Sequence, residues 1–457
     1  QNIYVLGRIL FEYDSYNAQI KDAKYLFPIV MLTILGLMYF CLRSLSFALA
    51  IAVVSVMSVG LTVGTVGWAQ VPFNQISNMG PLVVFMIAMA DSIHLVSVYL
   101  QGLHKSLSKF EALSESLRVN IQPVTLATVT TAMGFLSLNY CASPGIYGFG
   151  NVVAMGVVWA FLVTFTLLPA LILLLPVKKV PEPLGVKGFI NFVAKLVANH
   201  GKQLFWGSLL LIVVTFAMLP LNKVDFDRFS FIDKDSDFHT VISALAEKIG
   251  NDQSLVYSIN SGKYYGITEP EFLRKIEKFS IWLEEQPQTS FVTSYTGFLK
   301  NRNMAENDND PAWEVLPEDN LQIIDYLVGY QLVQEIEPQL EPIFNSEYSA
   351  IRMVVGTSNL SNVQLLDFSE EIEDWITLNM DPAYDVMHGD NSILYARLNK
   401  MISLQLMEGF TLSFLLITAT LLVGLKSVRY GLLSMIPNLF PATIVFGIWG
   451  LLVGELS

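Results

Sequence analysis

The sequence predicts a polytopic α-helical membrane protein with one large polar domain, because its apolar residues gather in long blocks that contain few charges. Hydrophobic residues make up 53% of the 457 positions and charged residues only 15%, a balance that is unusual for a soluble protein. A bilayer core about 30 Å thick needs roughly 20 apolar residues of helix. By that measure the chain has eight predicted spans, at about 26–42, 47–68, 79–100, 122–140, 150–175, 203–221, 404–425 and 430–453.

The charged residues are concentrated between the sixth and seventh predicted spans. Residues 223–400 hold 31 acids and 13 bases, whereas the rest of the chain holds 9 acids and 14 bases. In this stretch β-type runs alternate with helical patterns, in the order 254–259, 269–285, 349–355 and 363–378. The Asn- and Asp-rich segment 300–317 is predicted to be a loop. We therefore expect one acidic domain with mixed α/β packing.

The basic residues outside this domain predict the orientation of the chain. Eleven of the fourteen lie in alternate loops: Arg43, Lys105, Lys109, Arg118, Lys178, Lys179, Lys187, Lys195, Lys202, Lys426 and Arg429. By the positive-inside rule these loops are cytoplasmic. The acidic domain is then extracytoplasmic, together with the short loops 69–78 and 141–149.

An apolar stripe between the fifth and sixth spans predicts an amphipathic helix. It consists of Phe189, Ile190, Phe192, Val193, Leu196 and Val197, with Lys187 and Lys195 among the polar positions. Such a helix can lie on the cytoplasmic membrane surface. An ordinary connecting helix packed on protein explains the pattern equally well, so both interpretations stay open.

Asp91 is the residue of greatest functional interest, since it lies near the middle of the apolar span 79–100. A charged carboxylate at the bilayer midplane costs about 2.5–3.5 kcal/mol even on lenient insertion scales. Such a group is protonated, paired or turned toward water, and a carboxyl that gains and loses a proton suits a proton-coupled carrier. His94 follows one helical turn later as a candidate proton partner. The alternatives are a protonated Asp and a neutral His that bridge helices.

Threonines and glycine recur at helical spacing in the span 122–140. Thr125, Thr128, Thr130, Thr131 and Gly134 permit close helix packing and hydrogen bonds between helices in lipid. Some of these hydroxyls, together with Ser92 beside Asp91, are candidates to support the acid. Packing alone is the alternative for each of them.

A second feature is an internal repeat with an offset of 383 residues. The tight basic turn Leu42-Arg43-Ser44-Leu45 parallels Leu425-Lys426-Ser427-Val428, and a long apolar span stands on each side of both turns. Two parallel halves are typical of secondary transporters. The offset would place a counterpart of Asp91 near position 474. Because the chain starts with Gln1 and stops at Ser457, we expect a fragment cut at both ends.

Several motifs resemble the resistance-nodulation-division (RND) superfamily, and within it the predicted-exporter, MMPL-like branch. They are Ala90-Asp91-Ser92-Ile93-His94, Pro123 to Thr128, Thr130 to Leu138, the Arg43-Ser44 turn, and Ile436 to Pro441. The resemblance implies an RND-type transmembrane bundle with an extracytoplasmic α/β porter domain of ferredoxin-like, βαββ subdomains. It covers nearly all of the membrane portion. The external domain matches in placement only.

Against a family plan of twelve spans, the resemblance divides the chain into six parts. These are 1–24 as the end of the first porter domain, 25–176 as spans two to six, 177–202 as a cytoplasmic linker, 203–222 as span seven, 223–402 as the second porter domain, and 403–457 as spans eight and nine, before span ten.

The resemblance implies proton-driven export of hydrophobic or amphiphilic molecules, commonly lipids, by a homo-oligomer (dimer or trimer) in the inner or plasma membrane. The relay acid falls on Asp91 and its His neighbour on His94, with Ser92, Thr128, Thr130 and Thr131 as supporting residues. No cofactor, metal or nucleic acid is implied. The multidrug branch carries two adjacent acids in this helix, whereas Asp91 is followed by Ser92, which argues against drug efflux in particular.

The sequence bears on four other functions. An intramembrane aspartyl protease needs two membrane acids, and the only other acid in the complete spans is Glu408, near an outer end. A zinc enzyme is disfavoured because no His-Glu-x-x-His motif occurs and Asp91 with His94 supplies too few ligands. A sterol-sensing, Patched-like lipid receptor and a protein-export auxiliary of the SecDF type use the same kind of bundle and remain the alternatives to the exporter.

Overall fold

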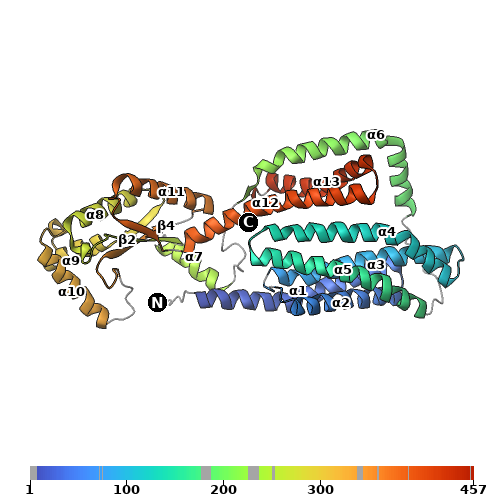
Figure 1. Ribbon diagram of the computed structural model, residues 1–457, viewed down its shortest axis with the longest axis horizontal. Helices are drawn as coiled ribbons and strands as arrows, with labels where there is room; N and C mark the ends of the chain where they lie inside the picture. The colour runs from blue at the N-terminus through green and yellow to red at the C-terminus, as the bar shows by residue number, and fades with distance from the viewer. Residues whose placement is uncertain are drawn as a thin grey trace. The chain divides into compact units, whose positions relative to one another are not determined.

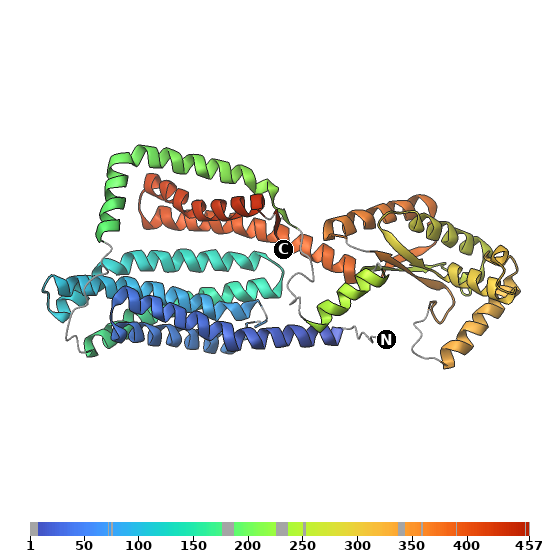
Figure 2. The ribbon, with the colours of Figure 1, turned by 180° about the vertical axis from the view of Figure 1, so that it is seen from behind.

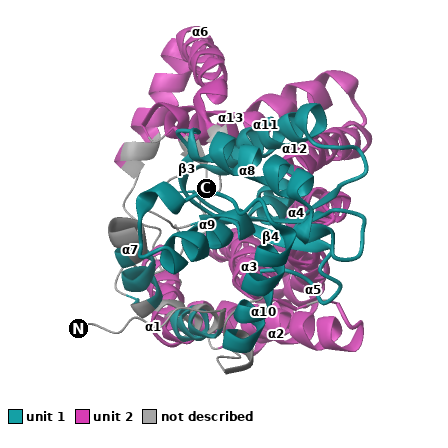
Figure 3. Ribbon diagram, turned by 90° about the vertical axis from the view of Figure 1, so that its left-hand side faces the viewer, with its two compact units in different colours: residues 1–19, 225–400, 457 teal, residues 20–224, 401–456 magenta. Residues whose placement is uncertain are grey.

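The computed structural model describes residues 8–71, 73–74, 76–175, 187–224, 236–249, 253–336, 343–357, 360–389, 391–452 and 454–456. Residues 176–186, which include Lys178, Lys179 and the start of the expected linker, lie outside the described residues, as do residues 1–7. The chain divides into two compact units (Figure 1 and Figure 3). Unit 1 comprises residues 1–19, 225–400 and 457, and unit 2 comprises residues 20–224 and 401–456.

Unit 2 contains a bundle of five long helices that follow one another along the chain (Figure 1). They are α1 (Arg8–Leu42), α2 (Leu45–Trp68), α3 (Gly80–His104), α4 (Lys109–Leu136) and α5 (Pro144–Leu174), with α5 packed against α2, α3 and α4. Short 3₁₀ turns, η1 (Ser77–Met79) and η2 (Ser137–Tyr140), precede α3 and α5. Helix α3 likewise packs against α2, α4 and α5, so α3 and α5 together form the centre of this packing.

Unit 2 also includes α6 (Lys187–Met218), α13 (Val428–Leu452) and residues 401–424 of α12 (Asn391–Gly424), whereas its share of α1 is residues 20–42. Helix α6 contains a non-helical residue at His200 (φ −124°), so it consists of two helices joined at a kink. Its second part runs beside α13 (Figure 2). Gly447 makes this contact possible, because a Cβ at that position would lie 2.4 Å from the backbone oxygen of Thr215. The helix expected from the apolar stripe at 189–197 is present as the first part of α6, before the kink at His200.

Seven helices among the described residues are long and apolar enough to cross a membrane. They are Leu45–Trp68, Ser77–His104, Lys109–Tyr140, Pro144–Leu174, Asn191–Leu221, Ser392–Gly424 and Val428–Leu452. Each coincides with one of the eight predicted spans. The remaining predicted span, 26–42, lies in α1, where the segment Pro28–Leu42 is a shorter apolar helix.

Small residues let α2, α3 and α5 approach one another closely. A Cβ on Gly156 of α5 would lie 2.1 Å from Val84 Cγ2 of α3 and 3.1 Å from Thr62 Oγ1 of α2. Glycines at such crossings are common in membrane bundles, where association depends on packing and not on the exclusion of water. The three helices thus meet at a point where any larger residue than glycine would separate them.

The two repeated turns have the same backbone conformation. Arg43 and Lys426 both adopt φ of 49°, in the left-handed region. The following serines start the next helices in the same way, since Ala48 N donates to Ser44 O at 3.1 Å and Gly431 N donates to Ser427 O at 2.9 Å. The repeat predicted from the sequence is therefore also a structural repeat of two helical hairpins.

Unit 1 is built around a four-stranded antiparallel sheet with the strand order β3-β4-β2-β5. The strands are β2 (Gln253–Asn260), β3 (Thr289–Thr293), β4 (Ala350–Thr357) and β5 (Asp385–His388). Helix α8 (Pro270–Glu284) connects β2 to β3, and α11 (Asn362–Asn379) connects β4 to β5. Helices α7 (Asp237–Ile249), α9 (Tyr295–Glu306) and α10 (Asn320–Ile336) complete the unit. Both predicted strands and both predicted helices of this domain are confirmed.

The core of unit 1 lies between one face of the sheet and its helices. Tyr257, Ile259, Met353 and Val355 from the central strands are fully buried with Phe279 of α8 and Ile372 of α11. They alternate with less buried residues along each strand, as expected for a sheet covered on one face. The remaining short elements of the chain are η3 (Leu219–Leu221), η4 (Gly266–Thr268), η5 (Pro311–Trp313), β1 (Lys223–Val224) and β6 (Glu455–Leu456), with β1 and β6 paired in parallel in unit 2.

The prediction of a loop over 300–317 is wrong for its first part. Residues 300–306 belong to α9, whose N-terminus is capped by the Ser294 side chain accepting from Gly297 N. The amide of Asn303 donates to the backbone oxygens of Trp313 and Val315, both at 3.0 Å. This polar side chain thus stabilises tertiary structure. Only the segment after Glu306 consists of turns, η5 and extended backbone.

Candidate functional site

The candidate site lies along α3, where one helix face is buried and another is open. Val84, Ala88, Ser92 and Leu95 are fully buried, whereas Met86, Ala90 and His94, spaced four residues apart, are exposed. Asp91 is half-buried and lies at the border between the two faces. Its carboxyl makes no hydrogen bond or ion pair with any residue in the described parts of the chain.

His94 is one turn from Asp91, as the sequence predicts, but the two side chains are not hydrogen-bonded to each other. The imidazole is exposed at the surface of the helix bundle, and within the described ranges it has no polar partner. In a bilayer an exposed imidazole on an apolar helix needs water, a lipid head group or another protein group. Helix α3 therefore carries two side chains that can bind a proton, three residues apart, and each can still form a hydrogen bond with water, lipid or another protein group.

Ser92, predicted to support Asp91, instead contacts α5. Its hydroxyl is fully buried and lies 3.4 Å from the Thr164 hydroxyl. One turn further, Ser116 Oγ of α4 donates to Leu95 O of α3 at 2.6 Å. These bonds attach α3 to α5 on one side and to α4 on the other. They fix the rotation of α3, and with it the direction in which Asp91 projects.

The three predicted threonines of α4 differ in their environments. Thr130 Oγ1 donates to the backbone of its own helix, at Leu126 O (2.9 Å) and Ala127 O (3.0 Å). Thr128 is buried, and its hydroxyl has no hydrogen-bond partner among the residues described. Thr131 is half-buried. Thr128 is thus the one of the three whose hydroxyl is both inside the bundle and available to another group.

A further buried hydroxyl on α3 was not singled out from the sequence. Tyr99, two turns beyond Asp91, is fully buried and packs edge-on against Phe47 of α2, with ring centroids 6.0 Å apart. Its OH has no partner within the described residues. A buried polar group without a partner calls for an explanation such as water in the bundle. The only signal in the sequence was a tyrosine on the same helix as Asp91.

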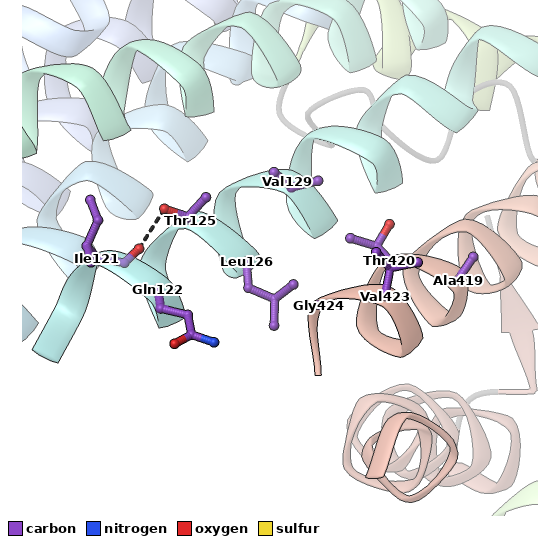
Figure 4. A pocket seen from close by; sticks show the side chains of 9 residues that line it. All are labelled: Ile121, Gln122, Thr125, Leu126, Val129, Ala419, Thr420, Val423 and Gly424. Atoms are coloured by element: carbon purple, nitrogen blue, oxygen red, sulfur yellow. Dashed lines mark hydrogen bonds between the residues drawn. The ribbon is translucent and has the colours of Figure 1, made fainter. Parts of the chain in front are cut away.

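A cavity of about 560 Å³ lies between α4 and α12 (Figure 4). Its walls are Ile121, Gln122, Thr125, Leu126 and Val129 from α4, and Ala419, Thr420, Val423 and Gly424 from α12. The two helices touch where Gly424 faces Leu126, since a Cβ there would lie 2.5 Å from Leu126 Cδ1. Near the other end of α12, Gln405 Oε1 accepts a hydrogen bond at 2.8 Å from Ala142 N, which lies in the segment after η2. The cavity is an open cleft along the facing sides of α4 and α12.

The architecture defines a multi-pass helical membrane protein with a small antiparallel sheet domain. A model of the MMPL family matches residues 1–195, so the resemblance seen in the sequence is confirmed over the region that contains α1 to α5. Over 162 residues, the chain is 26% identical to the hopanoid transporter HpnN of Rhodopseudomonas palustris (strain TIE-1). That alignment covers 33% of this chain and 18% of the transporter.

Two solved structures share the fold. The hedgehog release protein Disp from the water bear Hypsibius dujardini superposes with a TM-score of 0.58 and 14% identity, over 96% of this chain and 60% of Disp. SecDF, a translocon-associated membrane protein from Thermus thermophilus, gives a TM-score of 0.53 and 14% identity, over 99% of this chain and 49% of SecDF. The chain thus spans less than two thirds of the length of each of these relatives.

Proposed function

We propose that this chain belongs to a proton-driven exporter of hydrophobic or amphiphilic molecules, with lipid-like substrates. The similarity of part of the chain to a hopanoid transporter supports a lipid-like substrate. The lone acid on α3 supports proton coupling, and it is the observation on which this proposal depends.

The proton relay would use Asp91 as the group that gains and loses the proton and His94 as its partner. Asp91 is half-buried without a protein partner in the described part of the chain, and His94 is exposed one turn away. A carboxyl held in apolar surroundings strongly favours its neutral form unless water or a cation approaches it. A change in access to water would therefore load or release the proton. Thr128 of α4, whose buried hydroxyl has no hydrogen-bond partner among the described residues, would support the acid.

Unit 1 would act as an extracytoplasmic porter domain. Its strand order β3-β4-β2-β5, with a helix after the first and the third strand in sequence, is the order of a ferredoxin-like βαββαβ fold. Basic residues at the opposite ends of the spans favour the same orientation by the positive-inside rule. A dimer or trimer of the full-length protein completes the proposal, as the resemblance implies.

The test is proton flux in proteoliposomes that contain the full-length protein. A pH-sensitive dye trapped inside reports proton movement, and a fluorescent phospholipid reports lipid movement. Asp91→Asn keeps the size and polarity of the side chain but cannot titrate, so we expect at least a tenfold loss of coupled flux. Asp91→Glu, which retains a carboxyl, should keep part of it.

Correct insertion of each variant is checked by its yield and its elution as a single species. Undiminished proton and lipid flux in Asp91→Asn would refute the relay. Loss of proton flux with lipid movement unchanged would separate the two activities and would favour a lipid-binding receptor over an exporter.

A further inference from the structure

The cavity between α4 and α12 lies within the membrane-spanning part of both helices, close to their basic ends. On α4 the apolar stretch after Arg118 runs to Tyr140, about 33 Å of helix. The lining residues Ile121 to Val129 occupy the first half of that length. On α12 the lining ends at Gly424, two residues before Lys426. The cavity is therefore at the depth of one membrane leaflet.

The lining is apolar at depth and polar near the basic end. Val129 of α4 and Ala419 of α12 are the lining residues farthest along the chain from Arg118 and Lys426, and both are apolar. Thr125 and Thr420 satisfy their hydroxyls on their own helices, at Ile121 O (2.6 Å) and Leu416 O (2.8 Å), so they present mainly their methyl groups. Gln122 is exposed, and its amide has no hydrogen-bond partner among the described residues. This pattern fits a molecule with an apolar chain and a polar end.

Two cations lie at the polar end. Arg118 is on the same face of α4 as Gln122 and Thr125, because the three are spaced by four and three residues. Its only described ion pair is with Glu115, at 2.9 Å, and both side chains of that pair are exposed (78% and 43%). Lys426 lies in the turn after α12. Both side chains are long enough to reach a head group at the membrane surface while their stems cover apolar surface.

We propose that the cavity binds an anionic phospholipid from the leaflet at the basic end of the spans, with an acyl chain between α4 and α12. Gln122 hydrogen-bonds the ester region, and Arg118 and Lys426 attract the phosphate. By the positive-inside rule this is the cytoplasmic leaflet, where anionic lipids are concentrated. A volume of about 560 Å³ is within the usual range for ligand sites. The inference does not require that the lipid be transported.

The test uses the full-length protein in nanodiscs that contain equal amounts of phosphatidylglycerol and phosphatidylethanolamine. After delipidating washes in detergent, mass spectrometry quantifies the lipid that remains. The wild type should retain phosphatidylglycerol several-fold over phosphatidylethanolamine. Ala419→Phe fills the cavity from α12, and Val129→Phe fills it from α4, so each should lower retention at least fivefold. Val158→Phe adds an aromatic ring at an exposed apolar position of α5, away from the cavity, and should retain lipid like the wild type.

The charges are tested separately from the cavity. Arg118→Gln combined with Lys426→Gln should keep lipid bound but lose the preference for phosphatidylglycerol. Retention of both lipids in their bulk ratio by the wild type would overturn the anionic assignment. Unchanged retention in both Ala419→Phe and Val129→Phe would overturn the site. No proton gradient is applied, so failure here is independent of failure of the Asp91 relay.

Discussion

The Ser92 hydroxyl of α3 lies 3.4 Å from the Thr164 hydroxyl of α5, 72 residues later in the chain. Both side chains are fully buried. Since Asp91 is the preceding residue, a bond that holds Ser92 against α5 turns the acid about 100° away from that contact. The pair therefore orients the acid without touching it.

We expect the Ser92–Thr164 pair to contribute a small coupling energy. Hydrogen bonds between membrane helices average about 0.6 kcal/mol in double-mutant cycles. Ser92→Ala and Thr164→Val should each lower thermal stability in detergent slightly. The double variant should be less destabilised than the sum of the two single variants. Strict additivity would mean that the two hydroxyls do not interact.

Gly156 should be intolerant of even a methyl group. A Cβ would lie 2.1 Å from Val84 Cγ2, so Gly156→Ala forces α3 and α5 apart and should destabilise the bundle by about 1–3 kcal/mol, as overpacking does in other cores. Gly64 on α2 is the matched control, because nothing lies within 4 Å of its added Cβ. Gly64→Ala should be neutral, or stabilising by up to about 1 kcal/mol through helix propensity. Thermal unfolding in detergent compares the two.

An equal effect of the two alanine substitutions would contradict the close crossing. Because α3 carries Asp91, the Gly156→Ala variant should also lose proton flux in the proteoliposome assay, whereas the Gly64→Ala variant should keep it.

In unit 1, Lys300 should stabilise the contact between α8 and α9. Its Nζ lies 2.6 Å from Glu277 Oε1, and the two side chains are only 26% and 17% exposed. The second carboxylate oxygen of Glu277 is buried, with no hydrogen-bond partner in the described residues. Lys300→Met removes the only described cation at this carboxylate, so we expect a loss of about 1–3 kcal/mol.

Hydrogen exchange of the α8 and α9 amides in the full-length protein measures this loss. Lys263→Met is the control, because the Lys263–Glu269 pair is exposed (65% and 42%). It should leave amide exchange unchanged, as most surface ion pairs contribute little. Similar protection in wild type and Lys300→Met would show that the Glu277 contact is dispensable.

Local patterns in the sequence predicted the elements that depend on local chemistry. Spans were readable because about 20 apolar residues must stay together to cross a bilayer. The strands at 254–259 and 349–355 were readable because their buried residues alternate. Asn303 was misinterpreted because its residue type favours loops, whereas its amide bonds to Trp313 O and Val315 O within the fold. Tertiary contact overrode the local preference.

The candidate site was predictable only in part, for a similar reason. Asp91 and His94 were identified because a charged or titratable residue within a run of apolar residues is evident from the sequence alone. Thr164 was missed as the partner of Ser92, since nothing local marks which helix a serine faces. The α4–α12 cavity was missed because its walls, 121–129 and 419–424, are almost 300 residues apart. A cavity depends on the distance between helices in the folded protein, and no short sequence motif predicts that distance.

The left-handed turns at Arg43 and Lys426 bear on how the protein is made. Two residues separate α1 from α2 at the first turn, and three separate α12 from α13 at the second. A connection this short cannot stay in water while the first helix is already in the bilayer and the second is still being translated. Each hairpin must therefore pass from the translocation machinery into lipid as a single unit. Both arms of each hairpin then acquire their orientation in one step.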